Sequence, residues 1–374
     1  MAADVRTVKS GNAAEIFITA APAAGGGSEQ DAASFFSEIA AILRESRARV
    51  FQERVFADEA LLPELAEIRR AAYGDLDDGV PPAWLISPPG IHGGLAGVQV
   101  HAVAGCGDME IIDIAGKLYG RVAFVDDRRH IALSGLADPA ASDGCAAPDQ
   151  ARAVFDLAEF ALALAGTDML AVARTWLWLG NILDWYGDFN RVRTRFYTEC
   201  GLLDGHPQNR KLPASTGIGT RPAGTSACAL DLLAVAGGEN PIRYALAGGN
   251  QNSPFNYGSA FSRAACAPGI AGQTVFISGT AAIDADGHTR HPGDPDGQIA
   301  MTIDNVRAVL RLMSCTDADV VHAIVYCKTP EVEQIFRSGR HPLPWPHLTA
   351  IADVCRPDLL FEIEAAAAPG ATRQ

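Results

Sequence analysis

Two glutamates near the C-terminus are the residues of this chain best placed to do chemistry. The stretch CRPDLLFEIEA, residues 355–365, has the apolar content of a buried strand but includes Glu362 and Glu364. Because strand side chains alternate between two faces, both carboxyl groups point one way, while Phe361 and Ile363 point the other. A carboxyl group beside apolar side chains is costly unless it is paired or serves as an acid or base. These residues alone leave a solvated strand edge, ion pairs with arginine and a catalytic acid all open.

The elements that must position this strand occur twice in the chain. HIALSGLADPA from His130 resembles TVFISGTAAID from Thr274, and each apolar run ends in Ser-Gly. A polar loop follows in both copies, and then apolar residues recur at helical spacing over 148–167 and 295–314. An alternating strand, a short helix and a closing strand complete each copy. The order predicts an α+β fold of two tandem units, each a mixed sheet with helices on one face.

The duplication also sets the expected domain boundaries. We expect an N-terminal extension over residues 1–105, a degenerate first domain over 106–240, and a second domain over 241–374 that carries the two glutamates. Residues 1–105 match neither copy, so we expect them to pack on the first domain. Within them, residues 31–53 have a helical pattern with Asp31 in position to serve as N-cap.

The closing strands of the two copies provide an internal comparison. Matching Asp231-Leu232-Leu233 with Asp358-Leu359-Leu360 places Val235 opposite Glu362. The same strand position is then apolar in one copy and acidic in the other. We therefore expect this face to be partly buried, which makes an unpaired carboxyl group there costly.

Arginines suited to an anionic substrate are concentrated between the copies. Lys and Arg number 30 against 44 Asp and Glu, and the net charge of −14 makes extended nucleic-acid binding unfavourable. A small anion would instead need local guanidinium groups, and the candidates are Arg191, Arg193, Arg195, Arg210, Lys211 and Arg221. Arg191 and Arg195 share a helix face, where pairing with acids is the simpler expectation. Arg263, with Tyr257 nearby, has small and apolar neighbours, which favours a binding role.

Other chemistries lack their motifs. The eight cysteines are scattered without a CxxC pair, and His288 and His291 are expected in a surface loop without a third ligand. No GxSxG, P-loop or strand-GxGxxG-helix pattern is present. We expect no metal and no cofactor. The sequence has neither a signal-peptide pattern nor a membrane-length apolar window, so we expect a cytoplasmic protein that does not bind membranes.

Several motifs in order resemble two known protein groups. ISGTAAI, HPGD and the closing EIEA resemble the Rid (YjgF-like) family, whose small α+β units assemble as trimers. The fuller set, FNRVRTRFY, LPASTGIGT, NYGSAFSRA and ADVCRPDLLFEIEA, is similar to the chorismatases, over residues 115–368. Chorismatases cleave the enolpyruvyl ether of chorismate and have tandem Rid-like domains, matching the duplication inferred above.

The chorismatase resemblance assigns roles to individual residues. It implies that Glu362 is the general acid that protonates the enol ether, and that Cys355 marks hydroxybenzoate-forming members, with 3-hydroxybenzoate as the favoured product. Chorismate is a dianion, and Arg263 with Tyr257 is the first choice for one carboxylate, with Arg193 or Arg210 for the second. Further residues expected in the substrate site are Thr216, Thr280 and Ala281.

The expected partner is therefore chorismate, with pyruvate and a hydroxybenzoate as products, in a monomer or small homo-oligomer. Hydrolysis to a dihydroxycyclohexadiene carboxylate, formation of 4-hydroxybenzoate, a Rid-like imine deaminase and an aromatic-acid binding protein remain alternatives. The arginine that Rid deaminases carry upstream of the glutamate is replaced here by His347, which weighs against a deaminase.

Overall fold

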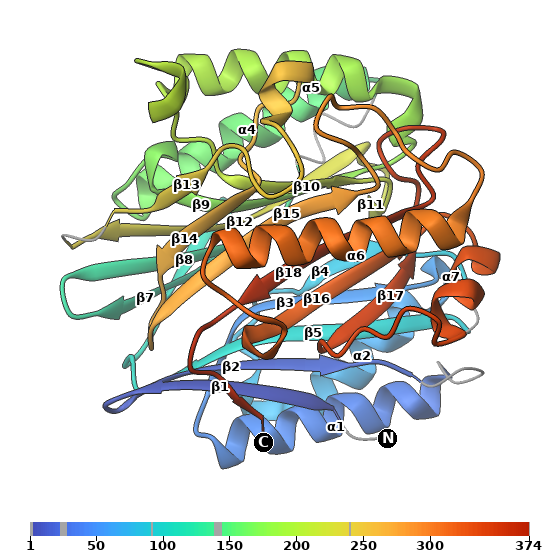
Figure 1. Ribbon diagram of the computed structural model, residues 1–374. Helices are drawn as coiled ribbons and strands as arrows, with labels where there is room; N and C mark the ends of the chain where they lie inside the picture. The colour runs from blue at the N-terminus through green and yellow to red at the C-terminus, as the bar shows by residue number, and fades with distance from the viewer. Residues whose placement is uncertain (1–2, 23–27, 91–92, 138–143, 239–240, 374) are drawn as a thin grey trace.

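The computed structural model describes residues 3–22, 28–90, 93–137, 144–238 and 241–373. These residues form three mixed sheets, each with a pair of helices on its outer face (Figure 1). We refer to residues 4–104, 110–237 and 243–367 as the first, second and third units.

The first unit is a complete sheet with two helices. Its strands are β1 (Asp4–Ser10), β2 (Ala13–Ala20), β3 (Arg49–Ala57), β4 (Ala83–Ile86) and β5 (Leu95–Ala104). Its helices are α1 (Glu29–Glu45) and α2 (Leu62–Tyr73), with short 3-10 turns η1 (Glu59–Leu61) and η2 (Gly74–Leu76).

The second unit repeats this order of elements. Its strands are β6 (Glu110–Ile114), β7 (Lys117–Val125), β8 (Arg128–Leu136), β9 (Val172–Leu179), β10 (Ala214–Ile218) and β12 (Cys228–Gly237). Its helices are α4 (Ala147–Leu164) and α5 (Ile182–Glu199), with η3 (Met169–Ala171) and η4 (Pro207–Asn209). The short strand β11 (Arg221–Pro222) leaves this unit and pairs with β4 of the first.

The third unit has the same plan. Its strands are β13 (Arg243–Ala245), β14 (Ala264–Pro268), β15 (Gln273–Ala281), β16 (Val320–Cys327), β17 (His347–Ile351) and β18 (Phe361–Ala367). Its helices are α6 (Pro295–Leu312) and α7 (Pro330–Arg337), with η5 (Pro254–Tyr257) and η6 (Asp317–Asp319). The last strand, β19 (Thr372–Arg373), pairs with β1.

All three units share one strand order. The sheets read β4-β3-β5-β2-β1, β10-β9-β12-β8-β7 and β17-β16-β18-β15-β14, so the closing strand always enters the middle of its sheet. The predicted α+β class and both tandem units are confirmed. The segment expected as an extension is itself a unit of this topology, because residues 4–104 form their own sheet and core. This unit was not recognised from the sequence because it lacks the Ser-Gly strand end that marks the other two.

The first helix differs from its predicted bounds. Helix α1 ends at Glu45, and the apolar residues after it belong to β3, so the predicted helix over 31–53 was too long. Ser28 is the N-cap, and Asp31 occupies the third helical position of a capping box. Arg47 follows the helix with φ of 51°, which breaks the helical path before β3 begins at Arg49.

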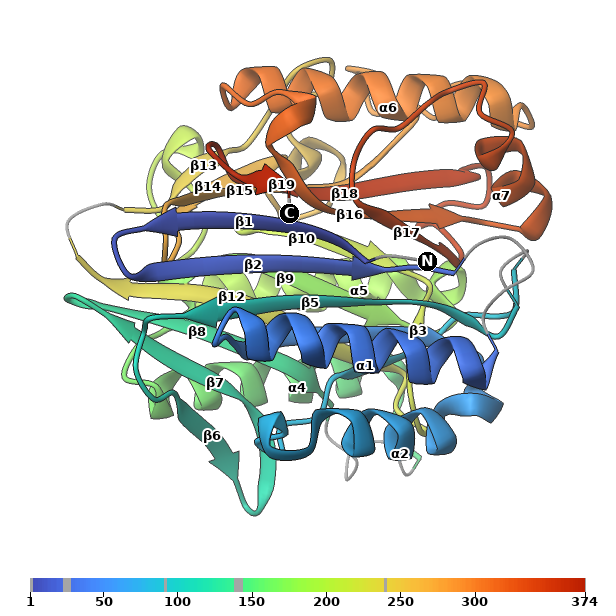
Figure 2. The same ribbon diagram turned by 90° about the horizontal axis from the view of Figure 1, so that it is seen from below.

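The three sheets turn their inner faces toward one another (Figure 2). Each helix pair covers a core of its own unit. A further core joins residues of all three sheets, including Phe56, Trp178, Phe276, Tyr326 and Leu348. Polar groups in the closing strands therefore lie between units and not in solvent.

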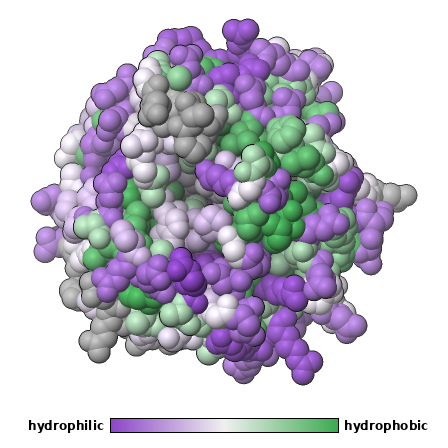
Figure 3. Space-filling view, turned by 180° about the vertical axis from the view of Figure 1, so that it is seen from behind, coloured by the Kyte–Doolittle hydropathy of each residue, from purple (hydrophilic) through white to green (hydrophobic). Residues whose placement is uncertain are grey.

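The outer surface is mostly polar. Hydrophilic residues surround smaller apolar areas on the face seen in Figure 3, in keeping with the charged composition. Among the described residues, no helix is both long and apolar enough to cross a bilayer.

Candidate active site

A cavity of about 150 Å³ lies between the second and third units. The second unit contributes Tyr186, Asn190, Ser215 and Gly217, from α5 and β10. The third unit contributes Tyr257, Ser259, Phe261, Arg263, Gly279, Ala281, Ile283, Cys355, Arg356 and Glu362. The wall therefore combines apolar and aromatic surface with one carboxyl group and two guanidinium groups, as a site for a small anionic ligand requires.

Glu362 is the acid of this cavity. It lies in β18 with Ala281 and Tyr326 beside it on the neighbouring strands, and only 5% of its surface is exposed. Burial raises the pKa of its carboxyl group to about 8, with a further contribution from the charge of Glu364. Arg174 and Arg263 oppose this shift. At neutral pH the group is therefore mostly protonated and can donate a proton.

Arg263 and Arg356 place positive charge on either side of Tyr257. The buried Arg263 donates from Nε to the carbonyl of Asn252 at 3.1 Å and from Nη2 to the Tyr257 hydroxyl. Arg356 donates from Nη1 to the carbonyl of Gly287 at 2.7 Å, with its guanidinium 5.5 Å from the centre of the Tyr257 ring. Both groups line the cavity, so two carboxylates of one ligand can each meet a guanidinium.

The Ser-Gly strand end has a direct function here. The Ser278 hydroxyl donates to the carbonyl of Ser262 at 2.5 Å and accepts from the backbone N–H of Ser215 at 2.8 Å, which fastens β15 to β10. At Gly279 a Cβ would lie 2.1 Å from Oε1 of Glu362. A side chain at this position would displace the carboxyl group, so glycine leaves it room.

Five of the predicted site residues line the cavity: Glu362, Cys355, Arg263, Tyr257 and Ala281. Burial raises the pKa of the Cys355 thiol to about 12, so the thiol is neutral. This residue contributes shape and not charge to the wall.

Four predicted residues lie elsewhere. Thr280 points to the other face of β15, where its hydroxyl donates to the carbonyl of Ser278. Thr216 lies behind the wall and accepts from Arg174 and from the N–H of Gly279. Arg193 is buried behind Asn190, to which it donates at 2.6 Å, and Arg210 lies in a separate groove with its guanidinium 3.9 Å from the centre of the Phe255 ring.

The expectation for the exposed basic residues is confirmed. Arg191 pairs with Asp188, and Arg195 pairs with Glu199. The side chains of His288 and His291 are exposed in the predicted surface loop.

The cavity includes residues that the sequence analysis missed. Tyr186 and Asn190 are four apart on α5, so their shared helix face was detectable. Arg356 directly follows Cys355 in the CRPD motif and lies far along the chain from the basic cluster between the copies. Burial raises the pKa of Tyr186 to about 12, so this phenol stays neutral.

Strand register corrects the comparison between copies. Tyr326 pairs with Glu362 and Ile324 with Glu364, whereas Trp178 pairs with Ala229 and Trp176 with Asp231. Ala229 is therefore the counterpart of Glu362. The alignment with Val235 was wrong, because Asp358 lies in the loop before β18 while Asp231 lies within β12.

The equivalent junction of the third and first units is filled. Gly97 on β5 is the equivalent of Glu362 in the first unit, because it pairs with Phe56 in the way that Glu362 pairs with Tyr326. A Cβ at Gly97 would lie 3.1 Å from the Leu348 side chain and 2.9 Å from the carbonyl of Ala20. Of these three equivalent strand positions, only Glu362 bears a carboxyl group.

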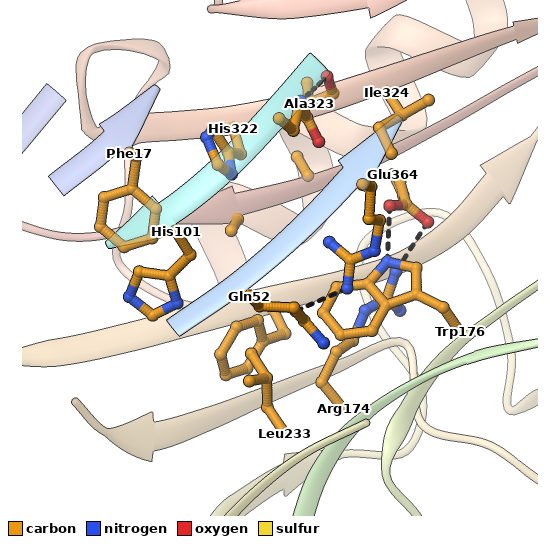
Figure 4. Close-up of a pocket in the computed structure, with 15 residues that line it drawn as sticks. Phe17, Gln52, His101, Arg174, Trp176, Leu233, His322, Ala323, Ile324 and Glu364 are labelled. Atoms are coloured by element: carbon orange, nitrogen blue, oxygen red, sulfur yellow. Dashed lines mark hydrogen bonds and ion pairs between the residues drawn. The ribbon is translucent and has the colours of Figure 1, made fainter. Parts of the chain in front are cut away.

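Glu364 faces a different cavity from Glu362. A small cavity of about 30 Å³ lies where the three inner faces meet, and Figure 4 shows Glu364 at its wall with Arg174 and Trp176. The predicted alternation of β18 is confirmed, since Phe361 and Ile363 pack in the core with α6. The exposed strand edge considered from the sequence is excluded, because both glutamates are buried.

Comparison with known proteins concerns mainly the third unit. Residues 256–369 match the sequence model of the family described as Endoribonuclease L-PSP. Glu362, Arg263, Tyr257, Cys355 and Arg356 all lie within this range, while the second unit supplies the opposite wall. No curated protein matches the chain.

One solved structure extends the likeness beyond residues 256–369. The crystal structure of a chorismatase is 23% identical, over 73% of this chain and 82% of that chain, with a TM-score of 0.53. YyfA of the Rid family from Yersinia pestis is 22% identical, over 29% of this chain and 86% of its own, with a TM-score of 0.25. A yeast protein, YEO7, is 14% identical, over 34% of this chain and 98% of its own, with a TM-score of 0.28. The chorismatase likeness shows a shared fold over most of the chain.

Proposed function

We propose that this protein is a chorismatase, which cleaves the enolpyruvyl ether of chorismate and releases pyruvate. The observation that carries the proposal is the buried carboxyl group of Glu362, whose pKa is raised to about 8 in a cavity with two guanidinium groups. The fold likeness to a chorismatase supports it over most of the chain.

Glu362 acts as the general acid in this proposal. Its proton goes to the methylene carbon of the enol ether, which leaves an oxocarbenium ion on the ether carbon and a carboxylate on Glu362. An acid whose pKa lies near the working pH is efficient because it is protonated before the step and still transfers its proton readily. The apolar and aromatic wall excludes water, which strengthens the electrostatic interactions within the cavity.

Arg263 and Arg356 hold the two carboxylates of the substrate. Arg263 is buried and already oriented by Asn252 and Tyr257, which lowers the cost of ordering it when the ligand binds. Arg356 replaces Arg193 and Arg210 as the second cation, because it lines the cavity whereas they do not.

The favoured ring product is 3-hydroxybenzoate. In this route the ring hydroxyl takes part in displacing the ether, and the atoms of chorismate divide between pyruvate and the hydroxybenzoate without added water. In the alternative hydrolytic route, water adds to the oxocarbenium ion and a dihydroxycyclohexadiene carboxylate leaves with pyruvate. Cys355 supports the first route, because it resembles the cysteine of hydroxybenzoate-forming chorismatases and lies on the cavity wall.

An imine deaminase or an aromatic-acid binding protein is the competing proposal, which the L-PSP match supports. His347, where Rid deaminases carry arginine, lies in β17, and its Nδ1 donates to the carbonyl oxygen of Trp345 at 2.7 Å. It lies outside the wall of the cavity that holds Glu362.

Incubation of the purified protein with chorismate tests the proposal. We expect stoichiometric pyruvate, measured with a coupled dehydrogenase, and 3-hydroxybenzoate by chromatography against authentic standards. No pyruvate above the protein-free background would overturn the chorismatase assignment. Saturable binding of chorismate without pyruvate would favour the binding protein.

A further inference from the structure

The two glutamates of β18 have opposite surroundings although they share a face. Glu364 accepts from Nε1 of Trp176 at 2.6 Å and from Nη2 of Arg174 at 2.8 Å. No hydrogen bond joins the carboxyl group of Glu362 to another described residue. This carboxyl group faces the cavity. Two residues along a strand separate such groups by about 7 Å, close enough for their charges to interact.

Both hydrogen-bond partners of Glu364 are suited to a carboxylate. The indole N–H and the guanidinium are hydrogen-bond donors and cannot accept a proton from a carboxylic acid. Arg174 adds a positive charge, which makes its bond to Glu364 a charge-assisted ion pair in a buried setting. Both partners come from β9, so the second unit fixes the charge of a residue in the third.

We propose that Glu364 is a positioning residue for the reaction proposed above: held as an anion by Trp176 and Arg174, it keeps the proton on Glu362. The inference rests on the proposed role of Glu362 as general acid. It assigns the two carboxyl groups different roles. Glu362 donates the proton, and Glu364, which never touches the substrate, keeps Glu362 protonated.

The other titratable groups near Glu362 leave this assignment standing. Arg174 and Arg263 favour the ionised form, while burial and the charge of Glu364 favour the neutral form and raise the pKa. The phenols of Tyr186 and Tyr326 and the thiol of Cys355 have pKa values raised by burial, so they carry no charge at neutral pH. Tyr257 and Arg356 complete the titratable groups of the cavity wall.

A purely structural role for Glu364 is the alternative, because polar contacts between units recur at its strand position. Asp231 in the second unit accepts from Nε of Arg54 in the first at 3.0 Å. Gln99 in the first unit donates to the carbonyl of Ala323 in the third at 2.8 Å. The residues two positions before Asp231 and Gln99 are Ala229 and Gly97, and neither has a titratable side chain. Asp231 is therefore a matched control that has the contact without the acidic neighbour.

The test compares Glu364→Gln with Asp231→Asn. The first readout is the pH dependence of kcat/KM for pyruvate release. The second is an infrared titration of the Glu362 carboxylic acid band, identified by its loss in Glu362→Gln. We expect Glu364→Gln to move the basic limb of the pH profile of kcat/KM to lower pH by about one unit or more. The titration midpoint of the Glu362 infrared band should move by the same amount. Asp231→Asn is expected to leave both unchanged while lowering thermal stability.

Unchanged midpoints in folded Glu364→Gln would overturn the proposal and leave the chorismatase assignment intact. If the wild-type protein releases no pyruvate, the proposed function fails, yet the infrared titration still tests the coupling. Should Glu364→Gln not fold, Glu364→Asp provides the decision because it keeps the charge. In Glu364→Asp, the pH midpoint of the Glu362 titration should stay within about half a pH unit of the wild-type value. A larger fall would show that the charge of residue 364 is not what keeps the proton on Glu362.

Discussion

Glu362 and Glu364 project from the same face of β18 into two different cavities. Glu364 is fixed by two donors from β9, whereas Glu362 faces Arg263 across the candidate site. One carboxyl group on this strand is therefore held in an ion pair, while burial raises the pKa of the other. Pairs of carboxyl groups whose environments separate their pKa values are a recurrent device for acid catalysis.

Replacing the acid should abolish turnover. Glu362→Gln keeps the shape of the side chain but has no proton of suitable acidity, and a lost general acid typically lowers rates by about 10² to 10⁴-fold. We expect pyruvate release to fall by at least the lower of these factors, with chorismate binding retained in calorimetry. Glu331→Gln, at an exposed glutamate of the same unit, is the control and should have wild-type activity. Activity retained in Glu362→Gln would move the acid role to another group.

The same substitution should stabilise the protein at high pH. The pKa of Glu362 is raised from 4.5 in the unfolded chain to about 8 in the fold. The unfolded chain therefore releases this proton first, and stability is lost as pH rises from about 4.5 through 8. Each pKa unit corresponds to about 1.4 kcal/mol, so the loss amounts to a few kcal/mol at most.

Thermal unfolding measures this effect. We expect the gain in Tm of Glu362→Gln over wild type to be larger at pH 8.5 than at pH 5, on the order of several degrees. An equal gain at both pH values would contradict the raised pKa.

Removing the second cation should weaken substrate binding. Arg356→Gln deletes a guanidinium at the cavity wall, and a hydrogen bond to a charged group contributes about 1.5–3 kcal/mol. We expect KM for chorismate to rise roughly 10- to 100-fold with a smaller change in kcat. Arg290→Gln removes an exposed arginine from the neighbouring loop and should leave KM unchanged. Equal KM values for the two variants would mean that Arg193 or another cation binds the second carboxylate of the substrate.

Cys355 should control the product more than the rate. Cys355→Ala removes a neutral thiol and leaves space that a water molecule can enter. Addition of water to the oxocarbenium ion competes with displacement of the ether by the ring hydroxyl, so the fraction of dihydroxycyclohexadiene carboxylate should rise while pyruvate release changes less. Chromatography of the ring products measures the ratio. Cys266→Ala, at a buried cysteine outside the cavity, is the control, and an unchanged ratio in Cys355→Ala would assign its thiol to packing alone.

Local patterns predicted much of this structure. The helical spacing over 148–167 and 295–314 gave α4 and α6 within a few residues, because an amphipathic helix must bury its apolar face whatever its partner is. The small and apolar neighbours of Arg263 favoured a binding role, and its side chain is buried at the wall of the cavity. Patterns were less informative where a partner sets the geometry. Arg193 had the residue type of a ligand for an anion, but its position behind Asn190 depends on how α5 packs.

The sequence by itself determined the class of the fold and the shared face of Glu362 and Glu364. Each follows from a local period of two or of 3.6 residues. Only the tertiary structure decided that residues 4–104 form a third unit, that Ala229 is the counterpart of Glu362, and that Glu364 is paired while Glu362 is not. The reason is that strand register and contacts between sheets depend on groups far apart in the chain. Trp176 and Arg174 lie 188 and 190 residues from the glutamate that they hold.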